Sequence, residues 1–390
     1  MLLIFLIPLY LLANTYVLSW LVRWMKIVAP AQNGLIIFLG ILYGILAFSI
    51  LFAFLTKIRF ITHISNIWFA MFPYLLLSVA MMDVIRIILK YGGNFRWSIE
   101  EGKRATNFWG IFCLIFVAIL SVYGFLRGKI IKKIFYQVQI KKDYSNKEVL
   151  RIVLIADLHL GYNTGYKMMR QMVRKINKEK PDLILIAGDI FDNDYNALKN
   201  PHKVAKVLSE AKSTFGTYGC YGNHDISEPI LAGFTFGRKK ERKSDIRMDE
   251  FLKEAKIKLL KDQKELIDKE IYLYGRADYE KPALEQKERK SPVQILAEMD
   301  AKKPIIVMDH QPVELQELAN LGVDLDVSGH THGGQMFPAS ITLKMIWENA
   351  YGLKKIGEMT SIVTSGIGVF GPNMRIGTKP EIVIIKTEFN

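Results

Sequence analysis

Long apolar runs dominate the first third of the chain, whereas short apolar runs alternate with polar segments in the remainder. Four apolar stretches cover roughly residues 1–22, 34–55, 64–89 and 107–126. Each is close to the ~20 residues that an α-helix needs to cross a bilayer. Tryptophans lie near the ends of these stretches, where interfacial aromatic residues are common. We therefore predict an all-α transmembrane region of four helices over residues 1–126.

A different pattern begins near residue 149. Apolar runs that are typical of buried strands lie at 151–156, 182–187, 216–220, 304–309, 325–328, 360–365 and 381–386. Between them, helical periodicity is found at 165–179, 197–212, 248–256 and 293–299. The alternation predicts an α/β layered sandwich over residues 149–390. Residues 127–148 are expected to form a basic juxtamembrane linker and a first edge strand.

Composition agrees with two unlike parts. The 390 residues are 50% hydrophobic and 23% charged, with a net charge of +14. Residues 1–126 account for +6 of that charge and the remainder for +8. The apolar content excludes a disordered or fibrous chain. With only two cysteines, a disulfide framework is excluded, and any metal must be held by His, Asp, Glu or Asn.

The basic residues that flank the apolar stretches suggest an orientation. Eight lie on the side that carries both chain ends, and six lie on the opposite side. Four of the eight, Arg127, Lys129, Lys132 and Lys133, directly follow the last stretch. Because short cytoplasmic flanks are enriched in Lys and Arg, we expect the C-terminal domain to be cytoplasmic.

One acidic and one basic residue interrupt the third apolar stretch. Asp83 and Arg86 are three residues apart, so they share a face of the predicted helix. An ion pair inside a membrane is a candidate functional site. The alternative, which we favour, is a pair near enough to the interface for both side chains to reach water.

Polar motifs follow five of the predicted strands. They are Asp157-Leu158-His159, Gly188-Asp189 through Asn193, Gly222-Asn223-His224-Asp225, Asp309-His310-Gln311-Pro312 and Gly329-His330-Thr331-His332-Gly333-Gly334-Gln335. The carboxyl ends of strands converge at one rim of an α/β fold, so we expect these side chains to meet there. Five of the seven histidines lie in the motifs, and the other two, His63 and His202, are interpreted as structural.

In their order and spacing, the five motifs resemble the calcineurin-like metallophosphoesterase superfamily. The resemblance runs from about Val149 to Lys386 and does not cover the apolar stretches. The Gly-His-Thr-His-Gly-Gly-Gln form is similar to a bacterial branch that includes membrane-associated members and some lipid-pathway hydrolases. The implied fold is the metallophosphoesterase sandwich, and the implied activity is metal-dependent hydrolysis of phosphoesters.

By position, the resemblance implies a site for two divalent ions. Asp157, His159, Asp189 and His332 would hold the first ion, and Asp189, Asn223, His310 and His330 the second. Ligands of this kind, without thiolate, suit Mn, Fe, Zn or Ni. Two such ions convert a shared water into a hydroxide nucleophile at neutral pH.

The resemblance also implies a proton donor. His224 would face the substrate and protonate the leaving oxygen as a general acid. Asp192 would orient His224, and such a carboxylate is expected to raise the pKa of the histidine and keep it protonated. Protein phosphatases of this superfamily carry an arginine at the next position, where this chain has Asn193. Protein phosphatase activity is therefore not favoured.

Two further features are candidates for substrate binding. Arg276 follows a predicted strand, although an ordinary surface arginine is the alternative that we favour. Soon after the candidate acid, Arg238, Lys239 and Lys240 begin a basic stretch. It is either a solvated loop or a basic cap that meets anionic lipid head groups or a nucleotide.

Taken together, the sequence predicts a membrane-anchored, two-metal phosphoester hydrolase that acts on a phospholipid or a nucleotide–lipid pyrophosphate. One alternative is a phosphodiesterase that acts on soluble nucleotides or nucleic acid. Nucleic acid is not favoured as a partner, because much of the positive charge flanks the membrane. A second alternative is a non-catalytic membrane regulator that uses the domain as a sensor.

Overall fold

The computed structural model describes residues 2–92, 98–231, 234–235, 244–282 and 288–389. Its N-terminal part consists of four helices, α1 (Leu2–Val28), α2 (Asn33–Thr56), α3 (Arg59–Gly92) and α4 (Ile99–Arg127). All four are long and apolar enough to cross a membrane. The four predicted apolar helices are thus confirmed, and each extends beyond its apolar stretch at one or both ends.

Asp83 and Arg86 form the expected ion pair on α3. Arg86 Nη2 lies 3.4 Å from Asp83 Oδ1, and the Tyr16 hydroxyl donates a 2.7 Å hydrogen bond to Asp83 Oδ2. The Arg86 side chain is 65% exposed, whereas that of Asp83 is 19% exposed. The pair therefore has one half-buried partner, bound to a second helix, and one that extends outward.

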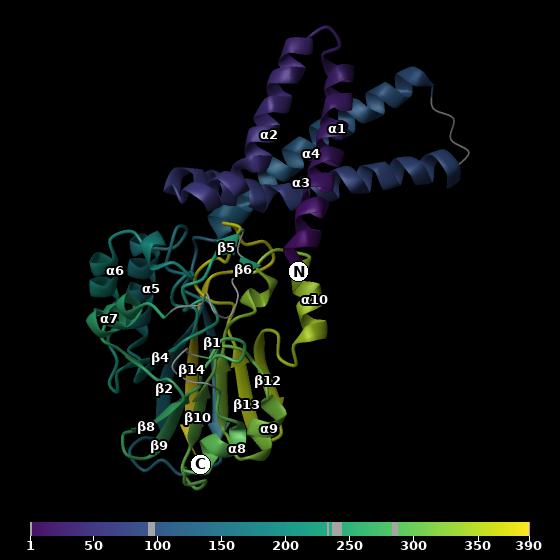
Figure 1. Ribbon diagram of the computed structural model, residues 1–390. Helices are drawn as coiled ribbons and strands as arrows, with labels where there is room; N and C mark the ends of the chain where they lie inside the picture. The colour runs from purple at the N-terminus through teal and green to yellow at the C-terminus, as the bar shows by residue number, and fades with distance from the viewer. Residues whose placement is uncertain (1, 93–97, 232–233, 236–243, 283–287, 390) are drawn as a thin grey trace. The chain divides into compact units, whose positions relative to one another are not determined.

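Two six-stranded sheets form the C-terminal domain, and most of their strands are labelled in Figure 1. The first sheet has the order β1 (Lys132–Ile140), β14 (Glu381–Phe389), β2 (Val149–Ile155), β3 (Leu183–Ala187), β4 (Thr217–Cys220) and β7 (Ile257–Leu259). The second has the order β12 (Gly352–Ile356), β13 (Met359–Val363), β11 (Leu325–Ser328), β10 (Ile305–Met308), β9 (Ile271–Gly275) and β8 (Gln263–Ile267). A separate short hairpin pairs β5 (Ile230–Leu231) with β6 (Phe234–Thr235).

Helices cover the outer face of each sheet. A cluster of buried side chains joins the first sheet to α5 (Tyr166–Glu179), α6 (Pro201–Leu208) and α7 (Ile246–Glu254). A second cluster fills the space between the two sheets, and a third packs the second sheet against α8 (Pro292–Leu296) and α9 (Leu315–Asn320). Helix α10 (Ala339–Ile346) follows the motif at Gly329–Gln335. The domain is therefore the layered α/β sandwich that the sequence predicts.

Several elements lie outside the predicted pattern. The second sheet gains β8 and β12, whose exposed positions interrupt the apolar runs. The helix predicted over 197–212 is confined to α6, because Asn200 adopts a left-handed conformation and Pro201 begins the helix. Proline is well suited to a first helical position, where its missing N–H costs nothing.

The parallel strands bring the polar motifs to one end of the sandwich. β2, β3 and β4 run parallel in the first sheet, and β10 and β11 run parallel in the second. Each of these five strands ends within a few residues of one polar motif. The carboxyl ends of both sheets therefore deliver the motifs to a shared rim.

We expect the core between the sheets to carry much of the domain's stability. Ile306 on β10 is fully buried there, so Ile306→Ala should lower the free energy of unfolding by about 2–5 kcal/mol. Val293→Ala on α8, where the side chain is 57% exposed, is the matched control and should change it little. Pulse proteolysis of the full-length protein across a urea series measures both values, and equal values would contradict this account of the core.

Candidate functional site

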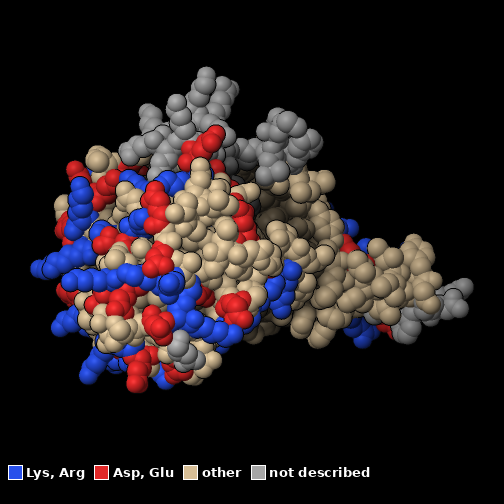
Figure 2. Space-filling model, turned by 90° about the horizontal axis from the view of Figure 1, so that it is seen from below, with Lys and Arg blue, Asp and Glu red and all other residues tan. Residues whose placement is uncertain are grey.

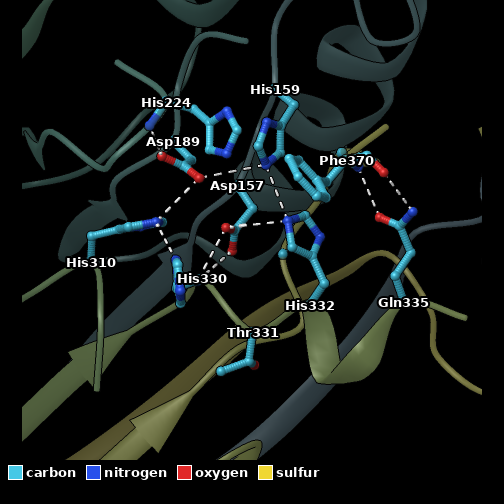
Figure 3. A network of polar contacts seen from close by, with 12 residues as sticks. Asp157, His159, Asp189, His224, His310, His330, Thr331, His332, Gln335 and Phe370 are labelled. Carbon is cyan, nitrogen blue, oxygen red and sulfur yellow. Dashed lines mark hydrogen bonds and ion pairs between the residues drawn. The ribbon is translucent and has the colours of Figure 1, made fainter. Parts of the chain in front are cut away.

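Side chains from five strand ends meet in one buried cluster. Asp157 and His159 follow β2, Asp189 follows β3, and Asn223 and His224 follow β4. His310 follows β10, and His330 and His332 follow β11. Figure 3 shows the five histidine rings turned inward around the carboxylates of Asp157 and Asp189. The structure thus brings together all seven ligands that the sequence predicts.

The first group of ligand atoms consists of Asp157, His159 and His332. The Nε2 atoms of His159 and His332 are 3.0 Å apart, and His332 Nε2 is 3.5 Å from Asp157 Oδ1. All three residues are buried. Two imidazole nitrogens and a carboxylate oxygen that face one another are a set of ligand atoms that suits a divalent cation.

The second group consists of Asp189, Asn223, His310 and His330. His310 Nε2 lies 3.1 Å from Asp189 Oδ2, 3.1 Å from Asn223 Oδ1 and 3.2 Å from His330 Nδ1. The other ring nitrogen of His310, Nδ1, lies 2.9 Å from the carbonyl oxygen of Ala187 and donates to it. In a neutral ring, this bond leaves the Nε2 lone pair directed into the group.

Asp189 lies between the two groups. Its Oδ2 atom is 3.1 Å from His310 Nε2 and 3.6 Å from His159 Nε2, while Oδ1 accepts a 2.8 Å bond from the His224 backbone N–H. Atoms that bind one ion at ~2.1 Å lie about 3.0–3.4 Å from each other in octahedral or tetrahedral geometry. The separations within both groups are close to this range. The residues present therefore fit divalent metal ions, with Asp189 placed to contact two.

The backbone is strained where these ligands project. Asp157, His159, Asp189, His330 and His332 all have φ between 43° and 68°, a region that non-glycine residues seldom adopt. Such conformations persist at functional sites because the surrounding structure imposes them. At Gly222, a Cβ atom would stand 2.3 Å from Asp189 Oδ1, so the close approach of this loop requires glycine.

Electrostatics concentrate negative charge on Asp189. Burial opposes that charge, but the facing rings of His310 and His224 outweigh it and hold the pKa of Asp189 well below its usual range. Burial likewise opposes protonation of His310, yet the Asp189 carboxylate raises the pKa of that ring well above its ordinary value. Desolvation raises the pKa of Asp157 to about 6. The buried Asp189 carboxylate, which these histidine rings hold ionised, favours a bound cation.

Asp192 faces His224 as expected but forms no hydrogen bond with it. Asp192 Oδ1 is 4.0 Å from His224 Nδ1, at the limit of an ion pair, and 3.5 Å from Nδ1 of His159. The partner of His224 Nδ1 is instead the side-chain oxygen of Asn193, whose amide nitrogen donates to the Ile226 carbonyl at 3.0 Å. Asn193 therefore occupies the orienting position, at the residue where the sequence departs from the phosphatase pattern.

The expected rise in the pKa of His224 is also wrong. Burial lowers it to about 4, and the opposing effect of the Asp189 and Asp192 carboxylates does not overcome the burial. An amide oxygen, unlike a carboxylate at hydrogen-bond distance, brings no full charge to stabilise the imidazolium.

Arg276 is neither a surface arginine nor free to bind substrate. Its side chain is fully buried, and its guanidinium contacts Asp309 at 3.2 Å and Glu314 at 2.6 Å. Arg289 contacts the same two carboxylates at 2.6 Å and 3.0 Å. Asp309 directly precedes His310 in the chain, so we correct the assignment of Arg276 from substrate binding to support of the domain.

The basic stretch that includes Arg238, Lys239 and Lys240 lies outside the residues that the structure describes. Elsewhere on the domain, the face seen in Figure 2 carries Lys and Arg interspersed with Asp and Glu, whereas few charged residues are seen on the helical part in this view. On that face, the described basic residues do not gather into a continuous surface of one sign.

The structure adds supporting contacts of two residues to which the sequence analysis gave no role. Arg375 is fully buried, with Nη2 3.2 Å from His332 Nδ1 and 2.6 Å from the Gly368 carbonyl oxygen. Gln335 exchanges two 2.8 Å hydrogen bonds with the backbone of Phe370, whose ring stands edge-on to His224 at 4.9 Å. Arg375 lies 43 residues beyond its histidine partner, so its role depends on tertiary contacts that local spacing does not reveal.

Comparison with known proteins gives the same picture. The family model described as calcineurin-like phosphoesterase matches residues 150–334, which contain every predicted ligand. An uncharacterised metallophosphoesterase of Helicobacter pylori is 30% identical over 70% of this chain and 68% of its own length.

Two other relatives have more descriptive names. A transmembrane protein with a metallophosphoesterase domain from Danio rerio is 29% identical, over 74% of this chain and 65% of that protein. A UDP-2,3-diacylglucosamine pyrophosphatase, LpxG, of Chlamydia trachomatis is 23% identical, over 63% of this chain and 85% of that protein.

The corrected position of Arg276 leads to a test. Arg276→Met removes one cation from a buried cluster, and we expect the free energy of unfolding to fall by about 3 kcal/mol. Arg247→Met is the matched control, because the half-exposed pair of Arg247 with Asp245 contributes at most about 1 kcal/mol. Urea unfolding measures both changes. If Arg276→Met raised KM and left the free energy of unfolding unchanged, Arg276 would instead be assigned to substrate binding.

Proposed function

We propose that this chain, which belongs to the calcineurin-like metallophosphoesterase family, uses two divalent ions to hydrolyse a phospholipid or a nucleotide–lipid pyrophosphate. It is a membrane-linked, metal-dependent phosphoester hydrolase. The observation that supports the two-ion site best is the position of Asp189, within 3.6 Å of histidine nitrogens in both ligand groups. Mn, Fe, Zn and Ni all suit these ligands.

When bound, two divalent ions lower the pKa of a shared water and offset the charge that develops on the phosphoryl group. The residues around them fix the geometry. His310 is oriented by the Ala187 carbonyl, and Asp157 accepts the His330 backbone N–H at 3.1 Å and 3.2 Å. These bonds keep the ligand atoms in place before substrate arrives, so little reorganisation is needed during reaction.

His224 is the proposed general acid. Its backbone is tied to Asp189 at 2.8 Å, and its ring is held between Asn193 and the edge of Phe370. The seven ligands that the sequence predicts do not include His224. Because its pKa of about 4 leaves the ring neutral at pH 7, the proposal requires that the anionic substrate raise that pKa before the ring gives a proton to the leaving oxygen. In this proposal Asn193 sets the orientation of the His224 ring. Asp192 instead contacts Nδ1 of the neighbouring His159.

The lipid substrate class rests on two observations. The chain has four helices that could cross a membrane, which places the domain where amphipathic substrates concentrate. One relative is named as a pyrophosphatase of a diacylated nucleotide sugar. We place the domain on the cytoplasmic side, because basic residues cluster directly after the last helix. Hydrolysis of soluble phosphodiesters and a non-catalytic sensor role are the alternatives that the following experiments test.

Substitutions at two residues should distinguish the loss of catalysis from the loss of bound metal. With Mn²⁺ and bis-p-nitrophenyl phosphate, we expect Asp189→Asn to lose activity together with bound metal. His224→Gln should keep its metal and lose about 10²–10⁴-fold in kcat, because only proton transfer is removed. Elemental analysis beside the kinetics checks both. Loss of metal from His224→Gln would overturn the assignment, and an inactive wild-type protein with two bound ions would favour the sensor.

The lipid assignment has its own test. We expect kcat/KM for a diacylated nucleotide–sugar pyrophosphate in mixed micelles to exceed that for the same molecule without acyl chains by at least about 10²-fold, since acyl burial contributes roughly 0.8 kcal/mol per methylene. Mass spectrometry of a lipid extract incubated with wild type and with Asp189→Asn identifies other lipid substrates. Equal kcat/KM for the acylated and unacylated compounds, with no lipid consumed, would favour a soluble substrate.

A further inference from the structure

Helix α10 differs from the other helices of the catalytic domain. Within the described residues, α5 to α9 each place at least two buried side chains in the core, whereas α10 places none. Ile341, Met345 and Ile346 are 57%, 84% and 71% exposed. Ile341 and Met345 are four residues apart and therefore lie on one face of the helix. An exposed apolar face of this kind commonly marks a binding surface.

The same helix forms part of the wall of a cavity beside the metal ligands. Leu343 and Lys344 line a cavity of about 650 Å³, together with Trp347 and Gly333. Gly333 directly follows His332, and the Trp347 ring is 5.2 Å from the ring of His330. A molecule held along α10 would therefore have one end next to the candidate metal centre.

The chain enters the catalytic domain at the border of this cavity. Ile134 of β1 and Glu381 of β14 line it, and the backbone N–H of Lys132, the first residue of β1, donates to Pro380 at 2.8 Å. Only residues 128–131 separate β1 from the end of helix α4. Four residues extend over about 14 Å at most, so the start of β1 is tethered close to the end of a helix that is long and apolar enough to cross a bilayer.

The charges around α10 suit a phospholipid surface. Lys344 on α10 and Lys379, which also lines the cavity, are both exposed, as is Lys132 at the start of β1. Apolar side chains next to exposed lysines are the composition of helices that lie in a membrane interface. In contrast, α8 lies at the opposite end of the sandwich, near the C-terminus (Figure 1).

We propose that α10 is a membrane-contact helix, which inserts Ile341, Met345 and Ile346 into the surface of the bilayer that the N-terminal helices cross. The catalytic domain is then held at the lipid surface by two attachments, the covalent one at β1 and the apolar face of α10. The cavity between them opens the metal centre toward the lipid head groups. This contact does not depend on which phosphoester is hydrolysed.

Depth measurements by spin labelling test the contact without reference to activity. Met345→Cys and Ile341→Cys, each in a Cys113→Ala/Cys220→Ala background, carry a nitroxide on the full-length protein in nanodiscs that contain phosphatidylglycerol. Val293→Cys on α8, 57% exposed in the wild type, is the matched control. The collision rates of each label with oxygen, which partitions into lipid, and with a water-soluble nickel chelate are compared.

We expect a several-fold higher oxygen-to-nickel ratio at positions 345 and 341 than at 293, as for side chains below the head groups. Equal ratios at all three positions would overturn the proposal, because α10 would then face water. Protection of positions 345 and 341 from both reagents would also overturn it, because a protein surface, from a second copy or from the helices of the same chain, would cover α10. Since none of these outcomes involves hydrolysis, they are independent of the proposed activity.

Discussion

The site depends on the burial of ionisable side chains together, so that a cation is needed to balance the negative charge of the carboxylates. Asp189 is buried, ionised, and faced by histidines from both sheets. Each sheet supplies ligands from the ends of its parallel strands, so neither sheet alone would make the site. The apolar layer between the sheets fixes their separation and hence the distances among ligands. Strained backbone at five ligands is retained because this packing surrounds them.

Much of this arrangement could be predicted from the sequence, and the reason is local. Asp157 and His159, or His330 and His332, stand two residues apart just beyond an apolar run, and the run itself indicates a strand end. The sequence therefore places these side chains at one rim without any knowledge of distant contacts. The four N-terminal helices are equally local, since length and hydrophobicity alone define them.

The predictions that were wrong concern two kinds of contact. Some are contacts between segments that are distant in the sequence, and others depend on which of two neighbouring residues faces the site. Asp192 and Asn193 are neighbours, and only the direction of the turn after β3 decides which of them reaches His224. Arg276 is buried among Asp309, Glu314 and Arg289. The hydrophobic pattern of the sequence near Arg276 does not indicate those partners. The exposed helix α10 has too few residues for a clear period, and its meaning depends on the neighbouring cavity.

The central claim is that Asp189 joins two metal ions in one centre, and electron paramagnetic resonance of the Mn²⁺-loaded protein tests it most directly. Two ions that share a carboxylate ligand are magnetically coupled, so the account predicts an exchange-coupled spectrum in the wild type. Asp189→Asn should lose that coupling. A spectrum of isolated Mn²⁺ in the fully loaded wild-type protein would contradict the claim, because the two ligand groups would then bind ions independently or bind only one.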